Sequence, residues 1–293
     1  MDKLSGRDLL LLALLTLFWG LNWPVMKIGV RDFAPMSFRA LSMIGGLLVL
    51  AVMIRAQKLP WRVARQDWAE LFRLAFFNMT VWFVLAMYGV KLLASGKAAI
   101  LAYTLPIWSA IWGIAFFGER PSRRLWIGLV AAGIGVLLLL GEELMHMTGK
   151  PIGAACMLGA AAVWAYGTHL MSRRRLQVPI TVITFWSLLI SLVICGALVA
   201  VVERDQWVRW PDAAEWAAML YNAVVIFGFC QLIWFRLVGL LPPVASGLSV
   251  MLIPVVGLFS GMVMLGEQPG WQDYVALVSI LVAIATVLWP VRR

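Results

Sequence analysis

Long apolar stretches alternate with short polar connections from one end of the chain to the other. Each stretch holds close to the ~20 residues that a helix needs to cross the ~30 Å hydrocarbon core of a bilayer. The ten stretches run over residues 8–30, 35–55, 70–91, 97–117, 123–142, 150–171, 180–202, 214–238, 243–264 and 271–290. Because the connections are too short for an extramembrane domain, the pattern predicts an all-α membrane protein with ten transmembrane helices.

Composition agrees with a lipid environment. Apolar residues make up 63% of the 293 residues and charged residues 13%, whereas soluble domains average roughly 45–50% and about 25%. The 24 Lys and Arg and 14 Asp and Glu residues cannot cover a soluble body of this size. The net charge of +10 comes from short clusters between the stretches rather than from a basic face, so we expect no nucleic-acid partner.

The distribution of basic residues predicts an orientation. If the amino terminus lies inside, the inner connections and the two ends of the chain hold 16 of the 24 basic residues, and the outer connections hold eight. The positive-inside rule then predicts that both termini are cytoplasmic. We therefore expect an integral protein of a bacterial inner membrane, in contact with membrane lipid.

The second half of the chain repeats the first. Pro106 and Pro254 occupy equivalent places in the middle of an apolar stretch, and the same offset of 148 residues pairs Glu119 with Glu267 just after the end of each stretch. A unit of five helices that starts inside ends outside, so its copy enters the membrane upside down. The sequence thus predicts two inverted five-helix repeats, over residues 1–145 and 146–293.

Several motifs resemble a known superfamily. They are Phe18-Trp19-Gly20 with Lys27, the run from Leu101 to Ile107 that leads to Gly118-Glu119-Arg120-Pro121, and the run from Gly128 to Gly135. Together they resemble the drug/metabolite transporter superfamily, and within it the EamA-like exporters, in particular an aromatic amino acid exporter. The resemblance covers essentially the whole chain and implies two five-helix repeats and outward transport of small solutes.

One departure from relatives that export organic cations concerns the first stretch. Those relatives use a membrane-embedded glutamate in the first helix, but residues 9–30 contain no Asp or Glu here. Arg39, Lys91 and Lys97 lie near outer helix ends, where we expect them to reach the interface, and Lys27 is placed similarly. Without an acidic residue in mid-membrane, a neutral or zwitterionic solute is favoured over a permanent cation.

Tryptophan is the strongest compositional signal, with 16 residues. Most of them fall near the predicted membrane boundaries, where an aromatic belt explains them. The deeper ones need a partner for the indole N–H that lipid does not offer, so several should face the interior. Trp19 and Trp164 hold equivalent places in the two repeats and should line one central volume.

Polar residues near the deep aromatic residues predict a substrate pocket. Asn22 lies one helical turn after Trp19, and Asn78 and Trp82 share a helix face. Such amides could also serve only to hold helices together, and His169 could be an interhelical residue. We expect most substrate contacts to come from Trp19, Asn22, Asn78, Trp82, Tyr103, Trp164, His169, Tyr221 and Asn222.

Two prolines are candidates for gating hinges. In the middle of a helix, Pro106 and Pro254 would each delete an intrahelical hydrogen bond and leave the carbonyls of Ala102 and Val250 without a partner. Helices that line water or bend during transport tolerate this cost most readily. The alternative is a static kink retained for packing.

Small residues predict close helix contacts. Gly128, Ala131 and Gly135 in the fifth stretch, with Ala276 and Ala283 in the tenth, have the spacing that lets helices approach closely. We expect these two helices to pack against a neighbour or to form a homodimer interface.

The sequence contains no recognisable catalytic motif. HExxH, GxSxG and P-loop patterns are missing, and His146 beside Glu142 and Glu143 lacks the ligand spacing of a metal site. We therefore expect no enzyme activity, no metal and no cofactor. The favoured function is a secondary transporter that exports small amphipathic solutes, mainly aromatic and other neutral amino acids, by alternating access. The alternatives are an exporter of drugs or other metabolites, a channel, and a membrane-embedded lipid-modifying enzyme.

Overall fold

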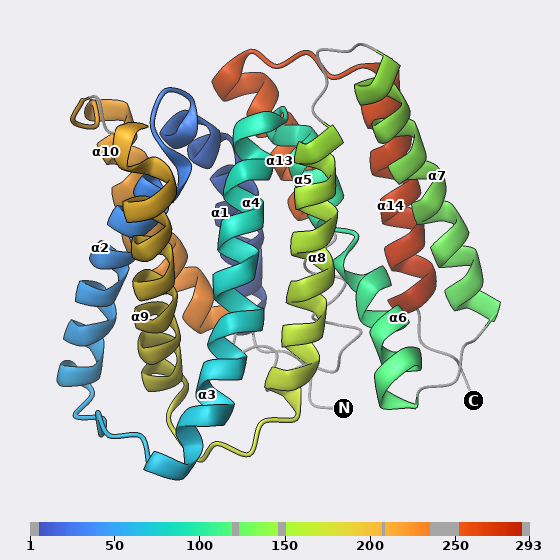
Figure 1. Ribbon diagram of the computed structural model, residues 1–293. Helices are drawn as coiled ribbons and strands as arrows, with labels where there is room; N and C mark the ends of the chain where they lie inside the picture. Colours follow the sequence, from blue (N-terminus) through green and yellow to red (C-terminus); the bar gives the residue numbers. More distant parts are fainter. Residues whose placement is uncertain (1–5, 119–122, 146–150, 207–208, 235–251, 289–293) are drawn as a thin grey trace.

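The computed structural model describes residues 6–118, 123–145, 151–206, 209–234 and 252–288. Every regular element in these ranges is a helix (Figure 1). In the first half they are α1 (Gly6–Val30), α2 (Pro35–Ala56), η1 (Arg65–Asp67), α3 (Trp68–Ala75), η2 (Phe76–Thr80), α4 (Val81–Leu92), α5 (Ser95–Ala102), α6 (Leu105–Phe117) and α7 (Arg123–Met145). In the second half they are α8 (Pro151–Ser172), α9 (Ile180–Leu198), η3 (Val199–Glu203), η4 (Arg204–Gln206), α10 (Ala213–Tyr221), η5 (Asn222–Cys230), α13 (Ile253–Leu265) and α14 (Trp271–Leu288).

The described helices include seven that are long and apolar enough to span a membrane. They are Leu10–Val30, Pro35–Ala56, Arg65–Leu92, Ser95–Phe117, Pro151–Ser172, Ile180–Gln206 and Ala213–Trp234. Three shorter apolar helices follow the same pattern, namely Trp126–Leu139, Ile253–Leu265 and Trp271–Ala283. Each of these segments falls on one of the predicted stretches. The protein is therefore an all-helical integral membrane protein in the part of the chain described, as the hydrophobic pattern predicted.

Helices of the two halves pack in matching combinations. α4 packs on α8 while α10 packs on α1, and α6 packs on α8 while α13 packs on α1. Likewise α2 contacts η5 while α9 contacts η2 and α3, and α5 contacts α13. Exchanging the first five predicted stretches with the second five turns each of these contacts into another one that is also present, except that the α5–α13 contact is turned into itself. The core of the bundle is therefore formed between the halves rather than within either of them.

The fourth predicted stretch is broken into two helices. α5 ends at Ala102 and α6 begins at Leu105, and the Thr104 side chain donates a 2.7 Å hydrogen bond to the Leu101 carbonyl between them. Pro106 lies in the first turn of α6, where the helix needs no donor from it. The prediction that Pro106 deletes a hydrogen bond within a continuous helix is therefore wrong.

The equivalent proline of the second half has the same local position. Pro254 lies in the first turn of α13, so it too deletes no hydrogen bond inside that helix. α6 and α13 also end alike, at Gly118 and Gly266 with φ of 69° and 67°, the left-handed conformation that glycine adopts most easily at a helix end. Glu119 and Val250 lie outside the described residues.

Two carboxylates, one fully buried and one partly buried, cap helices that are distant in sequence. Glu203 is fully buried and accepts hydrogen bonds from the Met36 and Ser37 backbone N–H groups at 2.9 and 2.8 Å, at the start of α2. Glu267 does the same for α5, because it accepts from the Ser95 and Gly96 N–H groups at 2.7 and 3.2 Å. Negative charge is stabilising at a helix amino terminus. These two carboxylates thus fix where α2 and α5 begin.

Two lysines that were expected to reach the membrane interface bind backbone carbonyls at helix ends, and their position relative to the membrane stays a prediction. The Lys27 ammonium donates to the carbonyls of Val90, Lys91 and Leu93 at 3.0, 2.9 and 2.7 Å, and so satisfies the end of α4. The Lys91 ammonium donates to the Phe33 carbonyl at 3.0 Å. Both lysines therefore tie helix ends together.

α7 and α14 form a separate pair at one edge of the bundle, on the right in Figure 1. A side chain added at Gly135 would lie 3.2 Å from the Ala276 carbonyl oxygen, which explains the small residues on this face. The predicted close contact of these helices is confirmed, and it lies within one chain. Their outer sides expose Trp126, Val130 and Val278. A homodimer through this pair stays a prediction.

Candidate functional site

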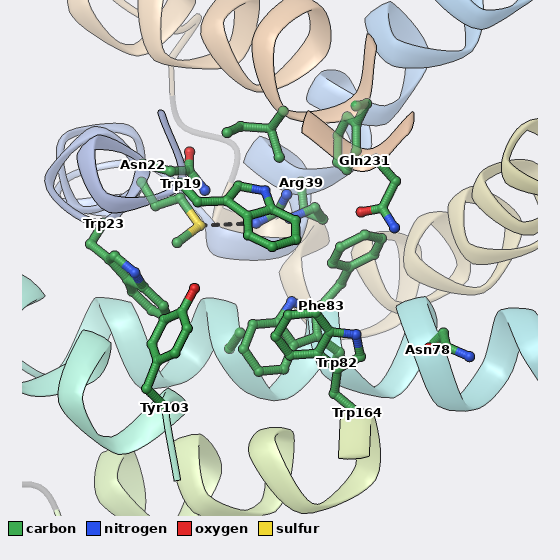
Figure 2. Close-up of a pocket in the computed structure, with 14 residues that line it drawn as sticks. Trp19, Asn22, Trp23, Arg39, Asn78, Trp82, Phe83, Tyr103, Trp164 and Gln231 are labelled. Atoms are coloured by element: carbon green, nitrogen blue, oxygen red, sulfur yellow. Dashed lines mark hydrogen bonds between the residues drawn. The ribbon is translucent and has the colours of Figure 1, made fainter. Parts of the chain in front are cut away.

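A cavity lies in the centre of the bundle, between helices of both halves (Figure 2). Its water-accessible volume is about 70 Å³, room for only a few waters at roughly 10–15 Å³ each. The cavity is lined by Trp19, Asn22, Trp23, Met26, Arg39, Asn78, Trp82, Phe83, Ala86, Tyr103, Trp164, Ile226, Phe227 and Gln231. These residues come from α1, α2, α4, α8 and the π-helical segments η2 and η5, from the turn after α5, and from the residues just after η5.

Indole rings form the largest part of the wall. Trp19 of α1 and Trp164 of α8 meet edge to face with ring centroids 6.0 Å apart, and Trp82 lies 4.7 Å from Trp164. Figure 2 shows these three rings close to one another across the centre of the site. Offset and edge-to-face pairs are the favoured arrangements of aromatic rings. Because the rings touch, a flat solute enters only if they separate.

Asn78 is held by an exceptionally close contact between helices. Its side-chain amide donates a 2.7 Å hydrogen bond to the Gly167 carbonyl of α8. A Cβ atom at Gly167 would lie 2.8 Å from the Asn78 backbone nitrogen, so only glycine permits this approach. Asn78 lies in η2, and π-helical turns of this kind are frequent at functional sites. The equivalent helix of the second half carries the π-helical segment η5.

Arg39 is the one charged side chain among the lining residues. Only 3% of its surface is exposed, so the expectation that it reaches the membrane interface is wrong. Its guanidinium carbon lies 4.8 Å and 5.6 Å from the ring centroids of Phe83 and Phe227. The fold buries it because α2 begins in the interior, where Glu203 caps its first turn.

Six of the nine predicted contact residues meet at the cavity. They are Trp19, Asn22, Asn78, Trp82, Tyr103 and Trp164. The other three do not line it, because their polar atoms bind neighbouring helices.

The three remaining residues have structural partners. The His169 Nε2 atom forms a hydrogen bond with the Ser109 hydroxyl, 2.9 Å away. The His169 ring also stacks on Phe117, with the ring centroids 4.7 Å apart. The Tyr221 hydroxyl donates to the Phe18 carbonyl at 2.7 Å. Asn222 is fully buried, and its Oδ1 atom accepts a 3.3 Å hydrogen bond from Arg39. Asn222 therefore acts on the cavity through Arg39.

Eight lining residues are outside the predicted set, among them Arg39 and the two phenylalanines around it. A signal for the phenylalanines is present in the repeat, because Phe83 and Phe227 are separated by the same 144 residues as Asn78 and Asn222. Phe83 and Phe227 thus hold equivalent positions in two helices that were already expected to line a pocket. This equivalence would have indicated that both rings are lining residues. No comparable signal distinguishes Arg39 from a basic residue that reaches the interface.

The chemistry of the described walls is simple. Besides Arg39 they offer three amides, of Asn22, Asn78 and Gln231, and one phenol, of Tyr103, and they include no Asp or Glu. Within the described ranges, no group of three His, Cys, Asp or Glu residues is arranged to hold a metal. Such a site can bind an amphipathic solute through ring stacking and a few directed hydrogen bonds.

Comparison with known proteins gives the family. The model of the EamA-like transporter family matches residues 7–141 and again residues 151–289. The chain belongs to the EamA-like transporter family. This transporter is thus a membrane protein of a family with two repeats, and the family and its relatives carry the names of transporters rather than enzymes.

Several curated proteins are similar to this EamA-like transporter over most of their length. The uncharacterized transporter YoaV of Bacillus subtilis is 24% identical over 86% of this chain and 87% of its own. A probable amino-acid metabolite efflux pump of Salmonella typhimurium is 27% identical over 90% and 89%, and one of Escherichia coli is 23% identical over 96% and 94%. A protein of known crystal structure aligns with 98% of this chain and 99% of its own at a TM-score of 0.70 and 18% identity, which shows a shared fold.

Proposed function

We propose that this EamA-like transporter exports small amphipathic solutes, chiefly aromatic and other neutral amino acids, by alternating access. The observation that carries the proposal is the cavity itself, whose walls combine three contacting indoles with three amides and come from both halves. Ring stacking suits a flat aromatic side chain. A site formed between two repeats is where alternating-access carriers bind their substrates.

The same proposal includes ten membrane crossings in two inverted repeats, over residues 1–145 and 146–293. The family model matches each half separately, and the interhelical contacts occur in pairs that exchange when the halves are exchanged. Rocking of one half against the other would then open the cavity to each side in turn.

We further propose a bacterial inner membrane location with both termini in the cytoplasm. The connections at 57–64 and 173–179 lie at the same end of the bundle, at the bottom of Figure 1. They carry exposed basic residues, Lys58, Arg62 and Arg173 to Arg175. Clusters of this kind mark the cytoplasmic side of a membrane protein.

Export of permanent organic cations is the less favoured alternative. The only charge among the described lining residues is the positive charge of Arg39, which repels a cation in a site of low dielectric constant. Two similar relatives are named as probable amino-acid metabolite efflux pumps, which also favours amino acids.

Counterflow in proteoliposomes tests the proposal. Purified protein is reconstituted with a high internal concentration of one unlabelled solute, and uptake of labelled aromatic amino acids, other neutral amino acids and amphipathic cations is compared. We expect saturable, stereoselective counterflow of the aromatic amino acids and little of the cations. Counterflow of cations alone would contradict the proposal, and flux that does not saturate would indicate a channel.

A further inference from the structure

Arg39 is a buried cation whose partners are weak. Its Nη2 atom lies 3.2 Å and 3.3 Å from the sulfur atoms of Met26 and Met87, and its Nη1 atom lies 3.3 Å from the Asn222 oxygen. Its Nε–H group is buried and has no acceptor. Thioether sulfur is a poor acceptor, and a guanidinium offers five donors in a planar fork. No carboxylate within the described residues bonds to this guanidinium, although a charge in such surroundings is costly without one.

Asn22 provides the complementary group on the same cavity. Its Oδ1 atom is buried and accepts no hydrogen bond. Asn22 and Met26 are four residues apart on α1, about one turn or ~6 Å along the helix. Since Met26 contacts the Arg39 guanidinium, Asn22 lies one turn along α1 from a residue that Arg39 touches, and all three side chains line the same cavity.

We propose that Arg39 and Asn22 together recognise the α-carboxylate and α-ammonium groups of a zwitterionic amino acid. This inference rests on the proposed function and specifies how the substrate is held. The carboxylate replaces the flexible Met26 and Met87 thioethers as acceptor of the guanidinium donors, because a charged oxygen accepts more strongly than sulfur. The ammonium donates to Asn22 Oδ1, and the side chain lies among Trp19, Trp82 and Trp164.

The arrangement distinguishes a zwitterion from singly charged relatives. A carboxylic acid without an ammonium leaves the Asn22 oxygen without a donor, and an amine without a carboxylate leaves the Arg39 donors with sulfur. A site that is built to hydrogen-bond a group discriminates against analogues that lack it, because its own buried polar atoms remain unpaired. The neighbouring indole faces also attract an ammonium. The described lining contains no carboxylate that would compete with the substrate for Arg39.

Binding of three probes to the full-length protein in lipid nanodiscs tests this pair. Calorimetric titrations use L-phenylalanine, 3-phenylpropionate, which lacks the ammonium, and 2-phenylethylamine, which lacks the carboxylate. The variants are Arg39→Met, Arg39→Lys and Asn22→Leu, and Lys91→Met is the control because Lys91 is a cation bound to a backbone carbonyl outside the cavity lining.

We expect wild type to bind phenylalanine about tenfold or more tighter than either analogue, the range that follows from losing one charged hydrogen-bonding group. Arg39→Met should weaken phenylalanine and phenylpropionate by a similar factor, and it should not weaken phenylethylamine, which binds as well as before or more tightly because the repulsion by the guanidinium is lost. Asn22→Leu should weaken phenylalanine and phenylethylamine and leave phenylpropionate unchanged. Arg39→Lys should retain part of the affinity, since it keeps the charge without the fork, and the control should behave as wild type.

The inference is overturned if wild type binds phenylethylamine or phenylpropionate as tightly as phenylalanine, if it binds no phenylalanine, or if Arg39→Met weakens all three probes equally. The wild-type series decides the matter even if Arg39→Met does not fold. Counterflow through wild-type proteoliposomes judges the proposed function separately: the expected binding pattern without flux would refute export and leave the recognition pair standing.

Discussion

Trp19 and Trp164, which hold equivalent positions in the two halves of the chain, meet edge to face with their ring centroids 6.0 Å apart. The Trp82 ring lies 4.7 Å from the Trp164 ring, centroid to centroid. The contact between Trp19 and Trp164 thus joins the two halves of the chain at the cavity. A solute that stacks between these rings must part them, which couples binding to the relative position of the halves.

Removing an indole should impair transport of aromatic substrates selectively. We expect Trp82→Ala and Trp164→Ala to weaken aromatic amino acid binding by up to about tenfold, since an aromatic pair contributes roughly 0.5–1.5 kcal/mol. Counterflow with aromatic and small neutral amino acids measures the ratio. Trp216→Ala is the control, because Trp216 is 45% exposed and does not line the cavity. Equal effects of the three substitutions would refute a role for stacking.

Asn222 should position Arg39 without touching the solute. Asn222→Leu removes the oxygen that accepts from Arg39 Nη1, so we expect weaker binding of carboxylate-bearing probes and unchanged binding of 2-phenylethylamine. A purely structural role would lower the thermal stability and weaken all probes together. Calorimetry combined with a melting curve of the same sample distinguishes the two results.

Glu203, which caps the start of α2, should be important for the stability of the folded protein. Glu203→Ala leaves two backbone N–H groups and the Ser37 hydroxyl without their acceptor, at a cost of roughly 1–3 kcal/mol for each buried group left unsatisfied. We expect a clear drop in melting temperature in detergent. Asp205→Ala is the control, since its ion pair with Arg204 is exposed and such pairs contribute little. An unchanged melting temperature of Glu203→Ala would contradict the cap.

The prolines remain candidates for gating positions at the starts of α6 and α13. Because neither deletes a hydrogen bond inside these helices, Pro106→Ala and Pro254→Ala should fold normally and bind substrate with little change. We expect slower turnover. Alanine would let each helix extend at its amino-terminal end, and the longer helix would favour one access state. Spin-label distance distributions between α5 and α13 report the state. Unchanged distances and unchanged turnover would show that both prolines are only structural.

Membrane orientation can be tested by labelling two exposed polar positions. Gln206 follows the seventh predicted stretch on the expected outer side, and Gln57 follows the second on the inner side. In a background in which Cys156, Cys195 and Cys230 are replaced by serine, an impermeant thiol reagent applied to intact cells should label Gln206→Cys but not Gln57→Cys. Labelling of Gln57→Cys alone would reverse the orientation.

The helices and six of the fourteen residues that line the cavity could be predicted from the sequence, because these inferences depend on periodicity. An apolar stretch of fixed length identifies a helix whatever its neighbours are, and helical spacing placed Asn78 and Trp82 on one face. The repeat then related Trp19 to Trp164. Each of these inferences needs only positions along the chain.

The features that were missed depend on partners far away in the sequence. Arg39 looks like a residue at a membrane boundary until the packing of α2 is known, because Glu203 and Asn222 lie more than 160 positions later. His169 looked like a cavity residue until Ser109 was found at its ring nitrogen. The break before α6 results from a turn at Tyr103 and Thr104, and a hydropathy pattern does not report a hydroxyl that bonds back to a carbonyl.

The contact between Gly167 and the Asn78 backbone gives the cavity an adjustment point behind its lining, because Gly167 is not among the lining residues. α8 and η2 approach until only a hydrogen atom fits between them, so the spacing of the two helices that carry Trp164 and Trp82 depends on the missing side chain. A methyl group at position 167 would act as a wedge behind the wall and move the two indoles apart. In this architecture a change of accepted solute size therefore requires no change in the residues that face the solute.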